Sequence, residues 1–240
     1  MNILITGISR GLGFEITKLF LEKNYKVYGI CTKSNPLLDE LQKEYSDSLF
    51  IKYFDLSDIE NIRSQIFKDF IPYTVHLQGF INNAAYAYDD IITNMNVTKL
   101  ENMYRVNTLA PMLIVKYVIR NMIFNRVKGS IVHLSSISVH TGYKGLSMYA
   151  STKGALEAFS KNTSREWGTK GVRSNCLVAG FMKTDMSSTL NEDQINRIFN
   201  RNSMKTPTSK TSVAETIEFL ISSKSKSITG QNIFVDSGTI

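Results

Sequence analysis

The sequence predicts an α/β protein with a single doubly wound sheet of seven parallel strands and helices on both faces. The first observation behind this prediction is that short apolar runs alternate with stretches of helical periodicity along all 240 residues. The second is that the apolar runs are continuous, as at residues 3–5, which is typical of strands buried on both faces. Such alternation favours right-handed crossovers between parallel strands. No repeat or linker interrupts the pattern, so one domain spanning residues 1–240 is expected.

Each element is expected where its periodicity begins and a turn or polar cluster ends it. The expected strands lie at residues 2–5, 26–31, 49–54, 79–81, 131–134, 171–178 and 228–236. The expected helices lie at residues 14–23, 36–45, 59–70, 98–124, 148–167, 190–200 and 212–221, and the one at 190–200 is polar with little apolar face. Ser212 followed three residues later by Glu215 is a capping-box pattern, which predicts that Ser212 caps the last helix.

Composition and charge argue against several classes of protein. The 28 lysine and arginine residues exceed the 21 acidic residues and give a net charge of +7, but they are scattered along the chain. A scattered surplus does not predict a nucleic-acid surface, although it suits an anionic ligand or an acidic protein partner. No apolar stretch approaches the roughly 20 residues that span a bilayer, and residues 3–5 are too few for a signal peptide. A cytoplasmic protein without a membrane partner is therefore expected. Cys31 and Cys176 lack metal-ligand spacing, so neither a disulfide nor a metal site is expected.

A glycine-rich loop joins the first strand to the first helix. The segment TGISRGLG at residues 6–13 contains Gly7, Gly11 and Gly13. Glycines allow a tight turn and the close approach of a ligand, and the free N–H groups at a helix start attract phosphate. The spacing Gly-x-x-x-Gly-x-Gly differs from the usual dinucleotide fingerprint, Gly-x-Gly-x-x-Gly. We expect a phosphate-bearing ligand at this loop.

The segment at residues 131–156 carries the most specific chemical signal. Its strand ends in Ser135 and Ser136, and the helix that follows places Tyr149 and Lys153 four residues apart on one face. A phenol acts as an acid or base at neutral pH when a cation favours its ionised form, and a serine hydroxyl can hold a carbonyl oxygen beside it. The alternative is an ordinary exposed tyrosine–lysine pair.

Taken together and in order, these motifs resemble the short-chain dehydrogenase/reductase family along nearly the whole chain. The motifs are Thr6-Gly7-x-x-x-Gly11-x-Gly13, Asn82-Asn83-Ala84, Asn107, Ser136, Tyr149-x-x-x-Lys153 and Asn175-x-x-x-Gly180-x-x-x-Thr184. Within the family, the chain is most similar to the 3-oxoacyl-acyl-carrier-protein reductases. The resemblance implies a Rossmann fold, with a substrate lid at about residues 184–210. Two motifs differ from the family pattern, because Ala85 replaces a glycine and Ala179 replaces a proline.

The resemblance also implies the roles of individual residues. Tyr149 would donate the proton and Ser136 would hold the carbonyl oxygen. Ser136 is preferred to Ser135 because it lies thirteen residues before the tyrosine, the usual separation. Lys153 would bind the nicotinamide ribose and lower the pKa of the tyrosine, and Asn107 would anchor a water relay to the lysine. The expected cofactor-binding residues are Gly7, Ser9, Arg10, Gly11, Leu12, Gly13, Thr32, Asp55, Leu56, Asn83, Ala84, Tyr149, Lys153, Gly180, Met182 and Thr184.

The end of the second strand predicts which cofactor binds. NAD-binding folds usually place an acid there to hold the adenosine ribose, and this chain has Cys31 and Thr32 instead. Arg10, with Lys33, could meet a ribose phosphate, which favours NADP(H); the alternative is that both are solvated surface charges. Asp55 could reach the adenine or cap a helix.

The expected activity is NADPH-dependent reduction of a ketone to a secondary alcohol. A 3-oxoacyl thioester on an acyl-carrier protein is the leading substrate, with Arg126, Lys128 and Lys170 as candidate basic contacts. The alternatives are a sugar, a polyketide or another small alcohol or ketone, and, from a different class, a non-catalytic dinucleotide-binding regulator. The family resemblance further implies a homotetramer or dimer. His140 either lines the substrate pocket or has a plain loop role.

Overall fold

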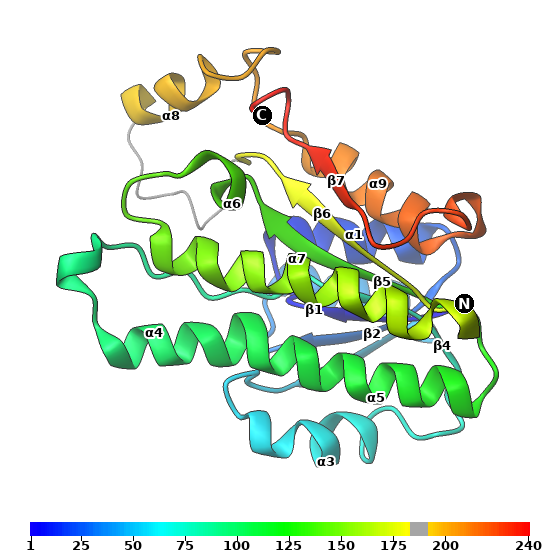
Figure 1. Ribbon diagram of the computed structural model, residues 1–240. Helices are drawn as coiled ribbons and strands as arrows, with labels where there is room; N and C mark the ends of the chain where they lie inside the picture. The colour runs from blue at the N-terminus through cyan, green and yellow to red at the C-terminus, as the bar shows by residue number, and fades with distance from the viewer. Residues whose placement is uncertain (183–191) are drawn as a thin grey trace.

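The seven strands form one parallel sheet, as the sequence predicts (Figure 1). The structure is a computed structural model that describes residues 1–182 and 192–240, with the backbone alone at 192–194. The strands are β1 Asn2–Thr6, β2 Lys26–Cys31, β3 Leu49–Tyr53, β4 Leu77–Asn82, β5 Ser130–Ser136, β6 Arg173–Ala179 and β7 Asn232–Val235. Their order is β3-β2-β1-β4-β5-β6-β7, so the direction of winding reverses between β1 and β4. Ligands of open α/β sheets bind at such a switch point.

Helices cover both faces of the sheet. One face carries α1 Gly11–Glu22, α2 Pro36–Glu44 and α9 Lys210–Ile221, and the other carries α3 Ile62–Phe67, α5 Ala110–Phe124 and α7 Ser147–Trp167. Apolar side chains fill each interface. Ile16 and Phe20 of α1 pack against Ile217 of α9 in one core, and Ile114 and Val118 of α5 pack under the sheet in the other. All five are fully buried, so the sheet is held rigidly from both sides.

The long helix expected at residues 98–124 is divided. It consists of α4 Val97–Tyr104, a π-helical turn Arg105–Leu109 and α5. Pro111 explains the division, because it has no N–H to donate to the carbonyl of Asn107 four residues earlier. The π-helical turn therefore contains Asn107, the residue that the family resemblance makes the anchor of a water relay.

Two helices nearer the C-terminus differ from expectation. Ser212 does not cap α9; the helix begins earlier, and the Ser209 side chain caps it by accepting from Ser212 N at 3.3 Å. The helix at 190–200 is observed as α8 Glu192–Phe199, but it does have an apolar side, because the Phe199 ring contacts Phe181 with centroids 5.9 Å apart. The expected lid at 184–210 begins among the residues that the structure does not describe.

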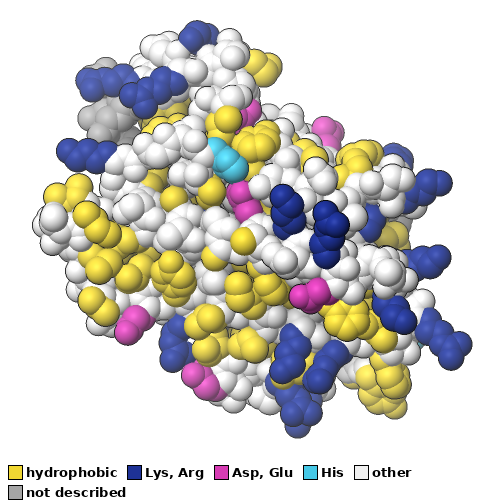
Figure 2. All heavy atoms as spheres, in the orientation of Figure 1, with side chains coloured by type: hydrophobic (Ala, Val, Ile, Leu, Met, Phe, Trp, Pro, Cys, Tyr) yellow, Lys and Arg dark blue, Asp and Glu magenta, His cyan; other side chains and the backbone are white. Residues whose placement is uncertain are grey.

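The surface has mixed character. Figure 2 shows lysine and arginine side chains in several separate groups on the face formed by α5 and α7. Within the described part of the chain, no helix combines the length and apolarity required to cross a membrane.

Candidate active site

A cleft of about 490 Å³ opens at the carboxyl ends of the central strands. Its size lies in the range typical of small-molecule and cofactor sites. Fourteen of the sixteen residues expected to bind cofactor line it: Gly7, Ser9, Arg10, Gly11, Leu12, Gly13, Thr32, Asp55, Leu56, Asn83, Ala84, Tyr149, Lys153 and Met182. The glycine loop and the tyrosine–lysine pair therefore share one cavity.

The glycine loop passes so close to neighbouring backbone that side chains would not fit. A Cβ on Gly13 would lie 1.9 Å from Gly7 O, and a Cβ on Gly7 would lie 2.9 Å from the Cα of Ala84. Gly11 has φ +58°, and a Cβ there would meet nothing within 4 Å, so this residue faces open space. The loop is thus tightly packed against neighbouring backbone at Gly7 and Gly13 and open at Gly11, which lets a ligand approach its backbone closely.

The loop is also fastened to the end of β4. Asn83 Nδ2 donates to Thr6 O at 3.0 Å and to Gly7 O at 3.1 Å. In return, Thr6 Oγ1 accepts from the N–H groups of Asn83 and Ala84 at 3.2 and 3.1 Å. These bonds fix the two sides of the switch point relative to each other, although Ala85 stands where the family pattern has glycine.

The start of α1 fits a phosphate group. No side-chain hydrogen bond from Arg10 caps this helix, and its first turn contains no acidic residue. The first N–H groups of a helix and its dipole attract an anion, and Arg10 adds a positive charge to the lining of the same cleft. A dinucleotide diphosphate therefore fits the residues present.

The ends of β2 and β3 form the far side of the cleft. Cys31 and Thr32 line it there, and neither can hold a ribose hydroxyl as a carboxylate would. Asp55 also lines the cleft, but its Oδ1 accepts from Ser57 N at 2.8 Å, so it stabilises the turn after β3 as well. Both interpretations of Asp55 remain compatible with this geometry.

Tyr149 and Lys153 come from the first two turns of α7, which packs on β5 and β6. Lys153 is 2% exposed, and its Nζ donates to Leu134 O of β5 at 2.8 Å. The same Nζ lies 5.7 Å from the centroid of the Tyr149 ring. Strand β5, which also carries Ser135 and Ser136, thus holds the Lys153 ammonium close to the Tyr149 ring.

Burial dominates the ionisation of both groups. It lowers the pKa of Lys153 to about 8, since a buried ammonium loses its hydration. It raises the pKa of Tyr149 above its ordinary value, and the negative charge of Asp89 raises it further. The net shift of the Tyr149 pKa is upward, and the lowering by Lys153 that the family resemblance implies stays a prediction. Tyr149 is protonated at neutral pH, as a proton donor must be.

Hydrogen bonds distinguish the two adjacent serines. Ser135 lines the cleft, but its hydroxyl donates to Glu157 Oε1. The same Oε1 contacts His140 Nε2 at 3.1 Å, and Glu157 Oε2 accepts from Asn232 Nδ2 at 2.6 Å. The Ser135 proton is therefore occupied. Ser136 Oγ instead accepts two hydrogen bonds, which leaves its own proton available. The geometry favours Ser136 as the donor to a carbonyl, although Ser136 itself is not part of the cleft lining.

Asn107 uses its side chain to hold the neighbouring segments. Its Oδ1 accepts from Tyr86 N at 2.7 Å, and its Nδ2 donates to Tyr86 O at 2.9 Å and to Thr152 Oγ1 at 3.1 Å. Asn107 is fully buried, and these three bonds satisfy its amide. The side-chain atoms of Asn107 are thus occupied, so a relay would have to use its backbone carbonyl, which Pro111 four residues on cannot bond.

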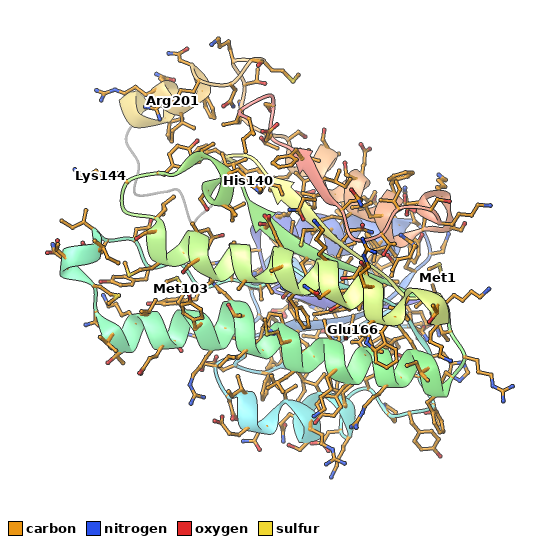
Figure 3. The ribbon with its side chains drawn as sticks, viewed as in Figure 1. Met1, Met103, His140, Lys144, Glu166 and Arg201 are labelled. Carbon is orange, nitrogen blue, oxygen red and sulfur yellow. The ribbon has the colours of Figure 1, made fainter. Side chains whose placement is uncertain are left out.

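Several expected residues lie elsewhere. Gly180 is buried beside Asp236 and Thr208 rather than in the cleft lining, and Thr184 lies outside the described residues. His140, in α6 Ser138–Thr141, does not line the main cleft (Figure 3). Its ring packs on Phe234 with centroids 4.9 Å apart, and its Nε2 lies 3.1 Å from Glu157 Oε1.

The three basic residues expected near the mouth of the site are in the wrong place. Arg126 and Lys128 precede β5, and Lys170 precedes β6, so they lie at the amino ends of these strands. The cleft opens at the opposite, carboxyl edge of the parallel sheet. Sequence distance from a motif does not reveal which edge a loop occupies.

Sequence reasoning missed six other lining residues: Ile30, Phe54, Tyr86, Asn102, Val106 and Leu134. Cys31, Ala85, Ser135 and Ala179, which the sequence singles out for other reasons, also line the cleft. Leu134 could have been found, because it lies near the carboxyl end of a strand at the switch-point side. Asn102 and Val106 come from the α4 region and gave no such signal.

His133 is a core residue, as its position within an apolar run predicts. It is fully buried between the rings of Phe80 and Phe159, and burial together with the nearby charge of Lys153 lowers its pKa to about 3. It is therefore neutral near the ammonium and does not compete with it for a counter-charge. Among the described residues, no group of three or more histidine, cysteine or acidic side chains could hold a metal ion.

Comparison with known proteins agrees with this geometry. Residues 7–239 match a family model described as Enoyl-(Acyl carrier protein) reductase. The chain is similar to 3-oxoacyl-[acyl-carrier-protein] reductase FabG of Buchnera aphidicola subsp. Acyrthosiphon pisum, with 30% identity over 238 residues that cover 98% of this chain and 95% of the relative. The solved structure of 4-hydroxyisoleucine dehydrogenase complexed with NADH has 25% identity and a TM-score of 0.93, covering 99% of this chain and 98% of that one. The structure of ElxO with NADP bound has 27% identity and a TM-score of 0.86 over the same shares.

Proposed function

Because the chain belongs to the short-chain dehydrogenase/reductase family of oxidoreductases, we propose that it is an NADPH-dependent enzyme that reduces a ketone to a secondary alcohol. One observation carries this proposal. Tyr149 and Lys153 line the same cleft as the glycine loop, so a proton donor lies in the cavity that fits a dinucleotide. The cofactor, when bound, supplies the hydride for the carbonyl carbon.

The residues of the chain supply the proton and the positioning. Tyr149 donates its phenolic proton to the carbonyl oxygen, and Ser136 donates a hydrogen bond to the same oxygen. The phenolate left on Tyr149 is stabilised by the ammonium of Lys153, which the carbonyl of Leu134 holds in place. To complete the cycle, Lys153 passes a proton to the Tyr149 phenolate, and a water that Asn107 is proposed to anchor through its backbone carbonyl then reprotonates Lys153.

The preference for NADPH rests on Arg10 and Thr32. Both line the cleft, and no carboxylate stands at the end of β2 to repel a ribose phosphate or to hold a free ribose hydroxyl. Measured dissociation constants should show NADPH binding at least about tenfold more tightly than NADH, the effect of one charge-assisted contact of roughly 1.5–3 kcal/mol. Arg10→Ala should reduce that ratio, and tighter binding of NADH by the parent enzyme would refute the preference.

A 3-oxoacyl thioester carried by an acyl-carrier protein is the proposed substrate. The name of the Buchnera relative supports it, and so does the net charge of +7, which suits an acidic carrier. Lys144, between α6 and α7, and Arg201, after α8, are both exposed and replace the three misplaced residues as candidate contacts (Figure 3). The similarity to 4-hydroxyisoleucine dehydrogenase favours, as a second candidate, oxidation of a small hydroxylated substrate.

A substrate comparison tests this proposal. Initial rates of NADPH oxidation should be measured with a 3-oxoacyl thioester on the carrier protein, the same acyl group on neutral N-acetylcysteamine, and a panel of sugars and cyclic ketones. Reduction of the carrier-bound thioester with the lowest KM is expected. Lys144→Glu with Arg201→Glu should raise that KM and leave the KM for the neutral thioester unchanged. Turnover confined to sugars or small alcohols would reject the carrier-protein assignment.

A homotetramer or dimer is proposed from family membership. Leu109 and Ile123 support it, because both are exposed apolar residues in the region of α5, where an interface with α5 of another copy would cover them. Light scattering coupled to size-exclusion chromatography gives the mass directly, and a monomer of 27.1 kDa would contradict the proposal.

A further inference from the structure

We propose that Ser138 is a positioning residue that turns the hydroxyl proton of Ser136 toward the substrate carbonyl. This inference rests on the ketone reduction proposed above. Ser138 is the first residue of α6 Ser138–Thr141, the short helix that follows β5, and its side chain is 3% exposed.

Ser138 donates two hydrogen bonds to the same atom. Its backbone N–H donates to Ser136 Oγ at 3.2 Å, and its hydroxyl donates to Ser136 Oγ at 3.0 Å. A serine oxygen has two lone pairs and one proton. Both acceptor positions of Ser136 are therefore filled by one residue, and the only remaining hydrogen-bonding direction is that of its own proton.

This arrangement matters because a hydroxyl rotates freely unless its acceptors and donors are fixed. Without the Ser138 hydroxyl, one lone pair of Ser136 would be open, and the proton would have additional orientations that do not point to substrate. The two incoming bonds also polarise the Ser136 hydroxyl and strengthen it as a donor. Ser138 thereby prepares Ser136 to hold the carbonyl oxygen before the substrate arrives.

The start of α6 is held in place from both sides. Ile137 N donates to Ala179 O of β6 at 3.1 Å, and Ile137 O accepts from the N–H groups of His140 and Thr141 at 2.9 and 3.0 Å. With Ser138 nearly inaccessible to solvent, water does not compete for Ser136 from that side. The contact is thus part of a rigid junction between β5 and β6.

If Ser138 only capped the turn after β5, its backbone hydrogen bond to Ser136 Oγ would be sufficient. Serine side chains often accept a bond from the N–H two residues on, which caps a turn, and the backbone bond of Ser138 alone does this. The hydroxyl bond adds nothing to that cap. Its effect falls on the proton of Ser136, so removing it should affect the chemical step rather than the fold.

The experiment compares variants of Ser138 in the complete enzyme. Ser138→Ala should lower kcat by roughly threefold to tenfold, the effect of one neutral hydrogen bond, and leave KM and the NADPH dissociation constant within about twofold. Ser138→Thr keeps the hydroxyl and should recover most of kcat. Ser138→Cys keeps the side-chain size with a weaker donor and should resemble the alanine variant; it also serves if the alanine variant does not fold. Thr141→Val, on the same helix, removes a hydroxyl that bonds only to Ile137 O and should leave kcat unchanged.

A double-mutant cycle decides whether Ser138 acts through Ser136. Single-turnover hydride transfer at high enzyme concentration should be slower in Ser136→Ala, and adding Ser138→Ala to that variant should produce no further loss. An equal loss in both backgrounds, or an unchanged kcat in Ser138→Ala and Ser138→Cys, would overturn the inference. Failure of the proposed function would look different, because the parent would then reduce no ketone at all.

Discussion

Replacing Lys153 with methionine should stabilise the protein while inactivating it. The buried ammonium has its pKa lowered from 10.5 to about 8, and each pKa unit corresponds to 1.36 kcal/mol, so the charged form costs about 3 kcal/mol at pH 7. The hydrogen bond to Leu134 O offsets this cost by about 1.5–3 kcal/mol. Methionine fills a similar volume without the charge. Lys153→Met should therefore be as stable as the parent at pH 7, or up to about 2 kcal/mol more stable.

The pH dependence gives the sharper test of this reasoning. Below pH 8 the lysine is protonated in both folded and unfolded chains, and the full cost is present. Between pH 8 and 10.5 the folded protein binds fewer protons than the unfolded chain, so stability rises with pH. From pH 7 to 9.5 the parent should gain about 2 kcal/mol relative to Lys153→Met, measured by urea unfolding of both proteins. Parallel pH profiles for the two proteins, or a loss of more than about 2 kcal/mol at pH 7, would refute it.

Three other perturbations have defined outcomes. Gly13→Ala should abolish NADPH binding, because its Cβ would lie 1.9 Å from Gly7 O. Gly168→Ala is the matched control, because a Cβ there meets nothing within 4 Å. Calorimetric titration measures NADPH binding by both variants. Glu218→Gln should destabilise by about 1–2 kcal/mol at pH 7, because the carboxylate bonds Lys23 Nζ at 2.8 Å and links α9 to α1. Desolvation opposes ionisation of Glu218, but its hydrogen bonds with Lys23 and Tyr25 lower the pKa overall. The difference in unfolding free energy between Glu218→Gln and the parent should therefore shrink as pH falls through that pKa. A difference that stays constant with pH would contradict a stabilising role for the ionised carboxylate. Ketone reduction should decline as pH rises through about 8, where Lys153 loses its charge, and a rate that rises there would be inconsistent with its role.

Local signals account for the parts of the fold that the sequence predicts well. Strand β2 agrees with its expected bounds, because apolar runs ending in turn residues depend only on neighbouring positions. Tyr149 and Lys153 share a face because helical periodicity requires it. The glycine loop was recognisable because its spacing stands between a strand and a helix.

The missed features depend on contacts between distant parts of the chain. The buried carboxylate of Glu157 bonds Ser135 of β5, 22 residues before it, and Asn232 of β7, 75 residues after it, and nothing in the local sequence marks either bond. The upward shift of the Tyr149 pKa has the same origin. The cation four residues away is visible in the sequence, whereas the burial and the charge of Asp89 that raise this pKa arise only after folding.

The central claim is that the Tyr149 phenol protonates a ketone oxygen inside the dinucleotide cleft. Tyr149→Phe removes that proton donor and keeps the ring, so the most direct measurement is the rate of NADPH-dependent ketone reduction by this variant beside its NADPH dissociation constant. The account predicts a fall in kcat of about 100-fold or more, with the dissociation constant within about twofold of the parent value. A variant that reduces the same ketone as fast as the parent would contradict it.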